Sequence, residues 1–205
     1  MSDISPQLVR ELRDKTNAGM MDCKRALAEA GGDLAKAEDL LRAKGIASAG
    51  KKASRSAKEG IVASYIHLQG KVGVLVEVNC ETDFVAKNDN FREFVKDITL
   101  HIAAANPTCV SREQVDPSEI ERERAIYRQQ VEGKPANIVE KIVEGKVDKF
   151  YGTICLMEQP FIKNPDVSIA DLVKSKITEL GENIVIRRFT RYMVGEGVAD
   201  ESAAE

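Results

Sequence analysis

The chain has 205 residues and a formal net charge of −3, with 43% apolar and 31% charged residues. This composition is typical of a soluble globular protein with one medium and one small domain. Because the net charge is not positive, direct nucleic-acid binding is not favoured. No apolar run approaches membrane-spanning length, and the first residues lack the basic and apolar regions of a signal peptide. We therefore expect a cytoplasmic protein that does not bind a membrane.

Residues 5–44 have the pattern of three short helices. Ser5 is suited to cap the first helix, with Pro6 at its first helical position. The glycines at 31–32 end the second helix, and Asp33 caps the third. A bundle this small is more typical of a binding module than of an enzyme.

The third helix is expected to end at Gly45, before a stretch of small and basic residues at 47–58. This stretch indicates a linker or an exposed basic helix between two folding units. Residues 45–51 match most of a phosphate-binding loop, but Lys52 stands where a serine or threonine is needed. A helix also precedes the motif where a strand is required. We therefore interpret the basic residues as a solvated face and not as a phosphate site.

Residues 60–68 and 71–80 predict two antiparallel strands joined by a tight turn. In the second strand, one face carries an alternating apolar set, namely Val72, Val74, Val76, Val78 and Cys80. A helix then follows and ends before Asn106 and Pro107. Its apolar residues recur with helical spacing at Phe91, Phe94, Val95, Ile98, Ile102 and Ala105.

The connection at residues 81–88 is polar except for one large aromatic ring, Phe84. Such connections lie at the protein surface, and the strand and helix on either side would hold this one still. The simpler expectation is that Phe84 folds back and caps its own sheet, because large apolar side chains are usually buried. The alternative is that the ring stays exposed and anchors a partner protein.

The remaining chain predicts a mostly exposed helix from residue 116, a helix from Pro135 with Ile138 facing inward, a helix at 168–181 and a last strand at 184–194. These elements indicate an α+β fold: a three-helix N-terminal bundle, then a core with a three-stranded antiparallel sheet packed by helices. Such a sheet leaves edges or a face open for self-association. The predicted domains are a bundle at 1–46, a basic linker at 47–59, a core and dimerisation domain at 60–198, and a disordered acidic tail at 199–205.

Cysteine and histidine residues give little support to an enzyme. The four cysteines, Cys23, Cys80, Cys109 and Cys155, are far apart in the sequence and form no C-x-x-C pair. Zinc and redox motifs are therefore absent, and the cysteines are expected to pack as small apolar residues. An enzyme using Cys23 or Cys80 with His67 or His101 is one rival hypothesis. A nucleic-acid module using the basic residues between 51 and 58 is another, but interleaved aromatic residues are missing.

Four stretches of the sequence match a known family. They are residues 12–27 (LRDKTNAGMMDCKRAL), 77–87 (EVNCETDFVAK), 144–161 (EGKVDKFYGTICLMEQPF) and 181–189 (GENIVIRRF). On these motifs the chain resembles bacterial translation elongation factor Ts, the guanine-nucleotide exchange factor for elongation factor Tu. The resemblance covers residues 4 to about 197.

The resemblance implies roles that spacing alone does not supply. The N-terminal bundle is similar to the family's ubiquitin-associated-like domain. Its partner-facing positions correspond to Arg13, Met20, Met21 and Lys24. In the core, the resemblance implies that the partner contacts are made by Thr82, Asp83, Phe84 and Val85, with Asp83 and Phe84 inserted between two helices of the partner. That insertion would disturb the magnesium and phosphate contacts of the partner, and GDP would leave.

The resemblance also implies an assembly. The chain is similar to short members of the family and is expected to lack the second core repeat, the coiled coil and the C-terminal helical module of the long forms. Short forms act as symmetric dimers, which implies a 2:2 complex with elongation factor Tu. Thr190 stands where some short members have a cysteine, so no disulfide across the dimer is expected there, and Asn17 replaces a glycine usual in its turn. We expect no enzymatic chemistry, cofactor or metal; an interaction module with a different partner is the alternative function.

Overall fold

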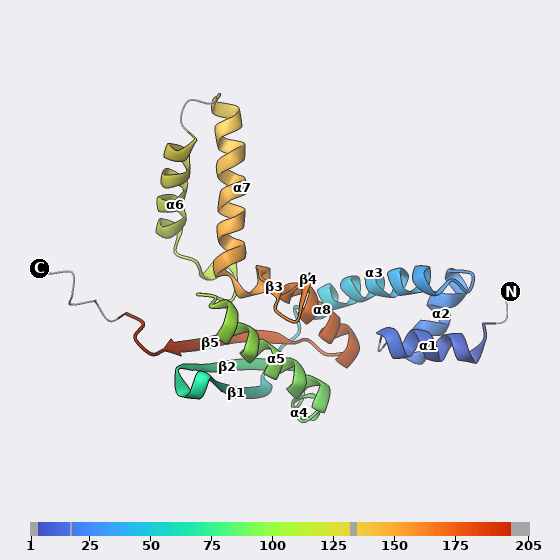
Figure 1. The fold of residues 1–205 in the computed structure, drawn as a ribbon. Helices are drawn as coiled ribbons and strands as arrows, with labels where there is room; N and C mark the ends of the chain where they lie inside the picture. The colour runs from blue at the N-terminus through green and yellow to red at the C-terminus, as the bar shows by residue number, and fades with distance from the viewer. Residues whose placement is uncertain (1–3, 17, 132–134, 198–205) are drawn as a thin grey trace, which may run out of the picture. The chain divides into compact units, whose positions relative to one another are not determined.

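The computed structural model of the chain describes residues 4–16, 18–131 and 135–197 (Figure 1). The chain forms two compact units, and each is assembled from segments that are separated in the sequence. Unit 1 comprises Met1–Gly60, Asn79–Phe94 and Asp171–Val185, and unit 2 comprises Ile61–Val78, Val95–Ala170 and Ile186–Glu205.

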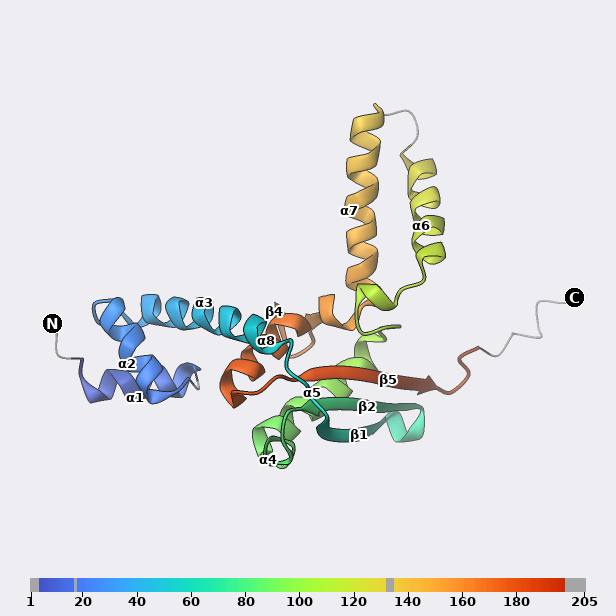
Figure 2. The same cartoon turned by 180° about the vertical axis from the view of Figure 1, so that it is seen from behind.

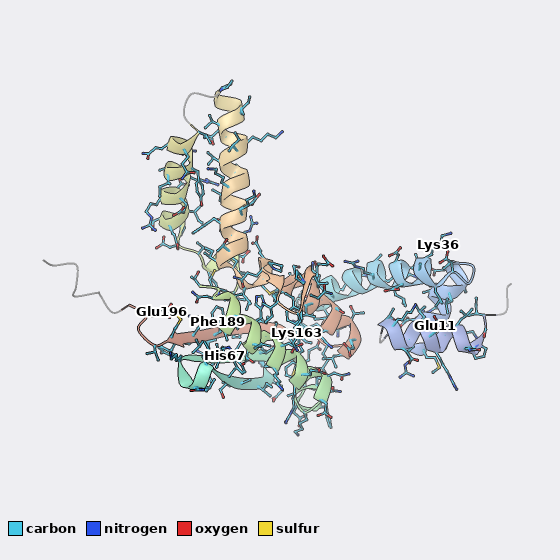
Figure 3. The ribbon with its side chains drawn as sticks, viewed as in Figure 1. Glu11, Lys36, His67, Lys163, Phe189 and Glu196 are labelled. Carbon is cyan, nitrogen blue, oxygen red and sulfur yellow. The ribbon has the colours of Figure 1, made fainter. Side chains whose placement is uncertain are left out.

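Unit 1 begins with the three helices that the sequence predicted, which are α1 (Pro6–Thr16), α2 (Met20–Glu29) and α3 (Leu34–Lys52). The Asp33 side chain caps α3 by accepting the N–H of Lys36 at 3.1 Å. The three helices enclose an apolar cluster of Val9, Leu12, Cys23, Ala26, Leu27, Ala37 and Leu41. Charged side chains such as Glu11 and Lys36 project outward from this bundle (Figure 3).

Helix α3 is longer than predicted, because it continues beyond Gly45 to Lys52. At least the first half of the basic stretch is therefore helical, in agreement with the interpretation of this stretch as a basic helix. The backbone N–H groups of a phosphate-binding loop must point at the ligand, whereas those within an α-helix bond to carbonyls one turn back. The rejection of a phosphate site at residues 45–52 follows directly.

The main sheet has the strand order β1–β2–β5 and is antiparallel, so the chain has the predicted α+β class. Its strands are β1 (Glu59–His67), β2 (Val72–Cys80) and β5 (Val185–Met193). The alternation predicted for β2 is confirmed, because Val72, Val74, Val76, Val78 and Cys80 are all buried. The strands β1 and β2 are joined by a 3₁₀ turn, Leu68–Gly70.

Helix α5 (Asp89–Ala105) lies across one face of the sheet, in front of it in Figure 1 and behind it in Figure 2. Its predicted apolar stripe is buried, except that Ala105 is only half-buried. Arg191 on β5 donates to the carbonyl of Ala103 at 3.3 Å, which ties the end of α5 to the sheet. One face of the sheet is thus covered by a helix whose stripe the sequence predicted.

Helices α6 (Pro117–Gln130) and α7 (Ala136–Ile154) pack side by side as a hairpin, which Figures 1 and 2 both show. Its core is Ile120, Val131, Val143 and Val147, with Tyr127 and Phe150 packed against them. Positions 143, 147, 150 and 154 follow the four–three–four spacing of a coiled coil. This spacing on one helix does not test the expectation that the chain lacks the coiled coil of the long forms, which stays a prediction. Ile138, expected to face inward, is exposed, because it lies outside this spacing.

A second, two-stranded sheet was not predicted. It pairs β3 (Pro160–Phe161) with β4 (Asn164–Ser168), and α8 (Ile169–Leu180) follows directly. The sequence indicated an extended segment near β3, but β4 contains a proline and three polar residues and lacks a strand pattern. Gly181 ends α8 with a φ of 79°, the left-handed conformation that favours glycine.

Two predictions fall outside the described residues, namely the turn at Asn17 and the disordered tail at 199–205. Among the described residues, no helix is both long enough and apolar enough to cross a membrane.

The packing of α5 can be tested by making the same substitution, isoleucine to alanine, at two different positions. Ile98 is fully buried on α5, whereas Ile126 on α6 is 40% exposed. We expect Ile98→Ala to lower the free energy of unfolding by about 2–5 kcal/mol, because it opens a cavity in the core. Ile126→Ala should change it by much less. Chemical denaturation of both variants measures the difference, and equal losses would contradict the assignment of α5 to the core.

Candidate partner-binding site

The segment predicted as a polar connection contains a single helical turn, α4 (Asp83–Ala86). The Thr82 hydroxyl caps this turn by accepting the N–H of Val85 at 3.4 Å. Threonine and aspartate at the start of a helix satisfy its free N–H groups, which explains why this sequence forms a turn. The turn positions the candidate side chains of the core, from Thr82 to Val85.

Phe84 projects from α4 with 82% of its surface exposed. The two residues after it anchor the turn to the protein, since Val85 is half-buried and Ala86 is buried. The ring therefore does not fold back to cap the sheet, and the simpler expectation from the sequence is wrong. A phenylalanine this exposed presents apolar surface to solvent that a partner protein would bury.

A carboxylate from a distant part of the chain holds the backbone next to Phe84. Glu182 accepts the N–H groups of Glu81 and Thr82, each at 3.0 Å, through one oxygen. Its other oxygen accepts the Thr82 hydroxyl at 2.6 Å. Hydrogen bonds to an ionised acceptor are stronger than neutral ones. Glu182 therefore fixes both the backbone and the capping side chain at the start of α4.

The interaction is reciprocal. Glu81 accepts the N–H of Asn183 at 2.6 Å, so each of the two carboxylates bonds the backbone beside the other. Asn183 is buried, and its side-chain amide donates to the carbonyls of Ala53 at 3.3 Å and Arg55 at 2.8 Å. We call Glu81, Thr82, Glu182 and Asn183 the carboxylate clamp. Its hydrogen bonds join three segments of unit 1: residues 81–82, residues 182–183 and the backbone at residues 53–55, which directly follow α3.

Asp83 is exposed and forms an ion pair with Lys87, one turn later, at 2.6 Å. The hydrogen bond from Lys87 is the main cause that lowers the pKa of Asp83 below its ordinary value. The carboxylate is therefore ionised at neutral pH, and protonation as the pH falls would weaken its pairing with Lys87. Beside the exposed ring, the turn thus presents one negative and one positive charge.

The candidate residues of the bundle are all at its surface. Arg13 on α1 and Lys24 on α2 are exposed. Met20 and Met21, which begin α2, are 50% and 65% exposed. Neither methionine packs in the bundle core, which Cys23, Ala26 and Leu27 fill from α2.

The pairs considered for an enzyme have other roles. Both ring nitrogens of the fully buried His101 lie within hydrogen-bond distance of partners, Gln159 Oε1 at 2.9 Å and the N–H of Ile162 at 3.4 Å. Burial raises the pKa of the Cys80 thiol to about 11, and the thiol donates to the carbonyl of Thr82 at 3.1 Å. Burial also raises the pKa of Cys23. Protonated thiols are poor nucleophiles, so these cysteines fit packing roles.

Comparison with known proteins decides the family. A family model described as Elongation factor TS matches residues 48–196, well over half of the chain. The chain is 58% identical to the protein named Elongation factor Ts of Alkaliphilus oremlandii, over 99% of this chain and 95% of that protein. It is also 58% identical to that of Carboxydothermus hydrogenoformans, over 98% and 95%, and 59% identical to that of Geotalea daltonii, over 95% and 91%.

The chain belongs to the elongation factor Ts family. Two of the three matching motifs in the core, at 77–87 and 181–189, contain residues of the carboxylate clamp, so the fold brings these two stretches together. Sequence reasoning did not identify Glu182 or Asn183 as site residues. The motif around them was the available signal, but nothing in its local pattern placed it beside Thr82.

The clamp predicts that Glu182→Ala loosens the turn that carries Phe84. Three hydrogen bonds to the carboxylate are lost, and hydrogen bonds to charged groups contribute roughly 1.5–3 kcal/mol each. We expect amide hydrogen exchange at Glu81 and Thr82 to become at least about tenfold faster, because local opening costs less free energy. The exposed Glu93 on α5 provides a control through Glu93→Ala. Unchanged protection at Thr82 in Glu182→Ala would show that the clamp is not needed.

Proposed function

We propose that this protein promotes the release of GDP from elongation factor Tu, as a guanine-nucleotide exchange factor in translation elongation. The observation that carries the proposal is Phe84, an exposed ring on a turn that the carboxylate clamp holds. Membership of the elongation factor Ts family supports the choice of elongation factor Tu as the partner.

In this proposal Phe84 acts as a wedge. Its ring enters an apolar site between two helices of elongation factor Tu and displaces groups that hold magnesium and phosphate. Asp83, beside it, orients the turn or competes for polar groups near the metal. Thr82 and Val85 contact the partner at the rim of the wedge. Because the clamp already orders the backbone, little conformational entropy is lost when the ring is buried.

No covalent chemistry is required for exchange. A factor that binds the empty partner more tightly than the GDP-loaded partner weakens GDP binding by the same factor, because binding free energies are linked. We therefore propose that the protein is not an enzyme. The raised pKa of Cys80 supports this, as does His101, because both of its ring nitrogens already have hydrogen-bond partners within the protein. We further propose that it acts in the cytoplasm, without direct contact to nucleic acid.

The N-terminal bundle is proposed to be a ubiquitin-associated-like domain at residues 1–46 that adds affinity for elongation factor Tu. Arg13, Met20, Met21 and Lys24 would contact the nucleotide domain of that partner, and their exposure supports this role. The apolar cluster of the bundle is drawn entirely from residues up to Leu41. We retain residues 60–198 as the proposed core domain, with the segment between the two as a connection that begins as helix.

We propose that two chains associate through the open face of the main sheet. On the face opposite α5, the exposed residues include four large apolar or aromatic side chains, Val62, Ile66, Leu75 and Tyr192. Glu77 and Arg188 form an ion pair on the same face at 2.7 Å. An apolar face with balanced charges fits a second copy of itself across a two-fold axis, and a 2:2 complex would follow.

Phe84→Ala tests the wedge. Burying a phenylalanine is worth about 1.5–3 kcal/mol, and roughly 1.4 kcal/mol is a tenfold change. The variant should therefore slow stimulated GDP release from elongation factor Tu by about 10- to 100-fold. Its melting temperature should not change, because the ring is exposed. Release of a fluorescent GDP and thermal melting measure the two effects.

Phe91→Ala is the matched control, because the Phe91 ring is fully buried seven residues further along the chain. Its truncation should lower the free energy of unfolding by about 3–5 kcal/mol. If the wild-type protein does not accelerate GDP release, the proposed function is wrong. If Phe84→Ala releases GDP at the wild-type rate, the wedge alone is wrong.

The dimer is tested by light scattering on the full chain. At micromolar concentration the protein should have about twice the chain mass of 22.5 kDa. Leu75→Glu places a charge in the centre of the open face and should give a monomer. Ile138→Glu, at an exposed position on α7, should leave the dimer intact. A wild-type monomer at this concentration would reject the proposed assembly.

A further inference from the structure

Cys109 and Cys155 are 46 positions apart in the sequence, yet their sulfur atoms lie 3.5 Å from each other. Cys109 precedes α6, and Cys155 directly follows α7, so the pair lies at the base of the helical hairpin. The sequence predicted that the four cysteines pack as small apolar residues, and its spacing gave no sign that these two meet. Both residues belong to unit 2.

The backbone around the pair is held by a short parallel bridge between Cys109 and Cys155. The N–H of Leu156 donates to the carbonyl of Cys109 at 2.9 Å, and the N–H of Met157 donates to that of Val110 at 3.0 Å. Bridged segments run about 4.8 Å apart, and disulfides join Cα atoms roughly 4.4–6.8 Å apart. Bond formation therefore requires rotation of the two thiols and no separation of the backbone.

The two thiols differ in access. Cys109 is partly exposed, whereas Cys155 is buried. Burial, together with the hydrogen bond to Cys109, raises the pKa of Cys155 to about 12. A dissolved oxidant therefore reaches Cys109 first, and Cys155 remains a protonated thiol until its neighbour has reacted.

We propose that Cys109 and Cys155 form a dithiol–disulfide redox site whose oxidant is a small-molecule disulfide. The Cys109 thiolate attacks one sulfur of the oxidant, forming a mixed disulfide and releasing the first small thiol. Cys155 then loses its proton and attacks the Cys109 sulfur, which releases the second thiol. The oxidant is reduced by two electrons to two thiols, and the protein dithiol is oxidised to one disulfide.

The disulfide closes a covalent loop that contains the whole α6–α7 hairpin. The base of this hairpin is already fixed by Arg112, which pairs with Asp148 at 2.9 Å and with Glu158, and which stacks over Tyr151 at 4.4 Å. The new bond adds a covalent constraint at the same place. It thereby reduces the freedom of the unfolded chain while the native backbone stays in place.

The test uses the full wild-type protein with oxidised glutathione under native conditions. Alkylation after denaturation, followed by peptide mapping, should show a Cys109–Cys155 link and a mass loss of about 2 Da. Cys23 and Cys80 should remain alkylated as free thiols. The melting temperature should rise by about 5–15 °C, because a long loop is closed in the unfolded state. Reduction with dithiothreitol should reverse both changes.

Matched variants separate this site from the other cysteines. Cys109→Ser should abolish the link and the shift in melting temperature, whereas Cys23→Ser should retain both. A glutathione adduct that persists at Cys109, or disulfides between chains, would overturn the proposal. A melting temperature that falls on oxidation would also overturn it, since the native backbone would then not accommodate the bond.

Discussion

The hydrogen bonds from the Glu81 and Thr82 backbone to the Glu182 carboxylate are the interaction on which the candidate site depends. A large apolar ring on an unsupported loop would either fold back onto the protein or sample many conformations. Here one oxygen of Glu182 takes two N–H groups, while the other takes the hydroxyl that caps α4. Since the turn begins at these atoms, the direction of Phe84 follows from them.

The reciprocal bond from Glu81 to the N–H of Asn183 extends this constraint to a second segment, and the Asn183 amide extends it to Ala53 and Arg55. Carboxylates that accept backbone N–H groups satisfy donors that would otherwise be buried without a partner. The clamp thus joins segments of unit 1 as well as holding the candidate site. A substitution within it is expected to affect both.

In unit 2 the two faces of the main sheet differ: one is buried and the other is exposed. Helix α5 buries the even-numbered valines of β2, and this face supplies apolar core. The opposite face keeps large apolar side chains in solvent beside the Glu77–Arg188 ion pair. A monomer gains no hydrophobic stabilisation from the second face, which is why a second chain is its proposed cover. The α6–α7 hairpin has its own apolar core, so its two helices need no other element to bury their stripes.

The sequence by itself determined the elements whose pattern is local. The alternation of β2, the stripe of α5 and the caps of the N-terminal helices follow from neighbouring residues, and the motifs around Thr82 and Glu182 indicated the family. Only the tertiary structure placed Glu182 beside Thr82 and Cys155 beside Cys109, and only it showed Phe84 exposed and α6 paired with α7. These contacts join residues between about 20 and 100 positions apart, and a carboxylate, a thiol or a thin apolar stripe accepts many partners. Which partner each one meets is decided by the packing of the whole chain.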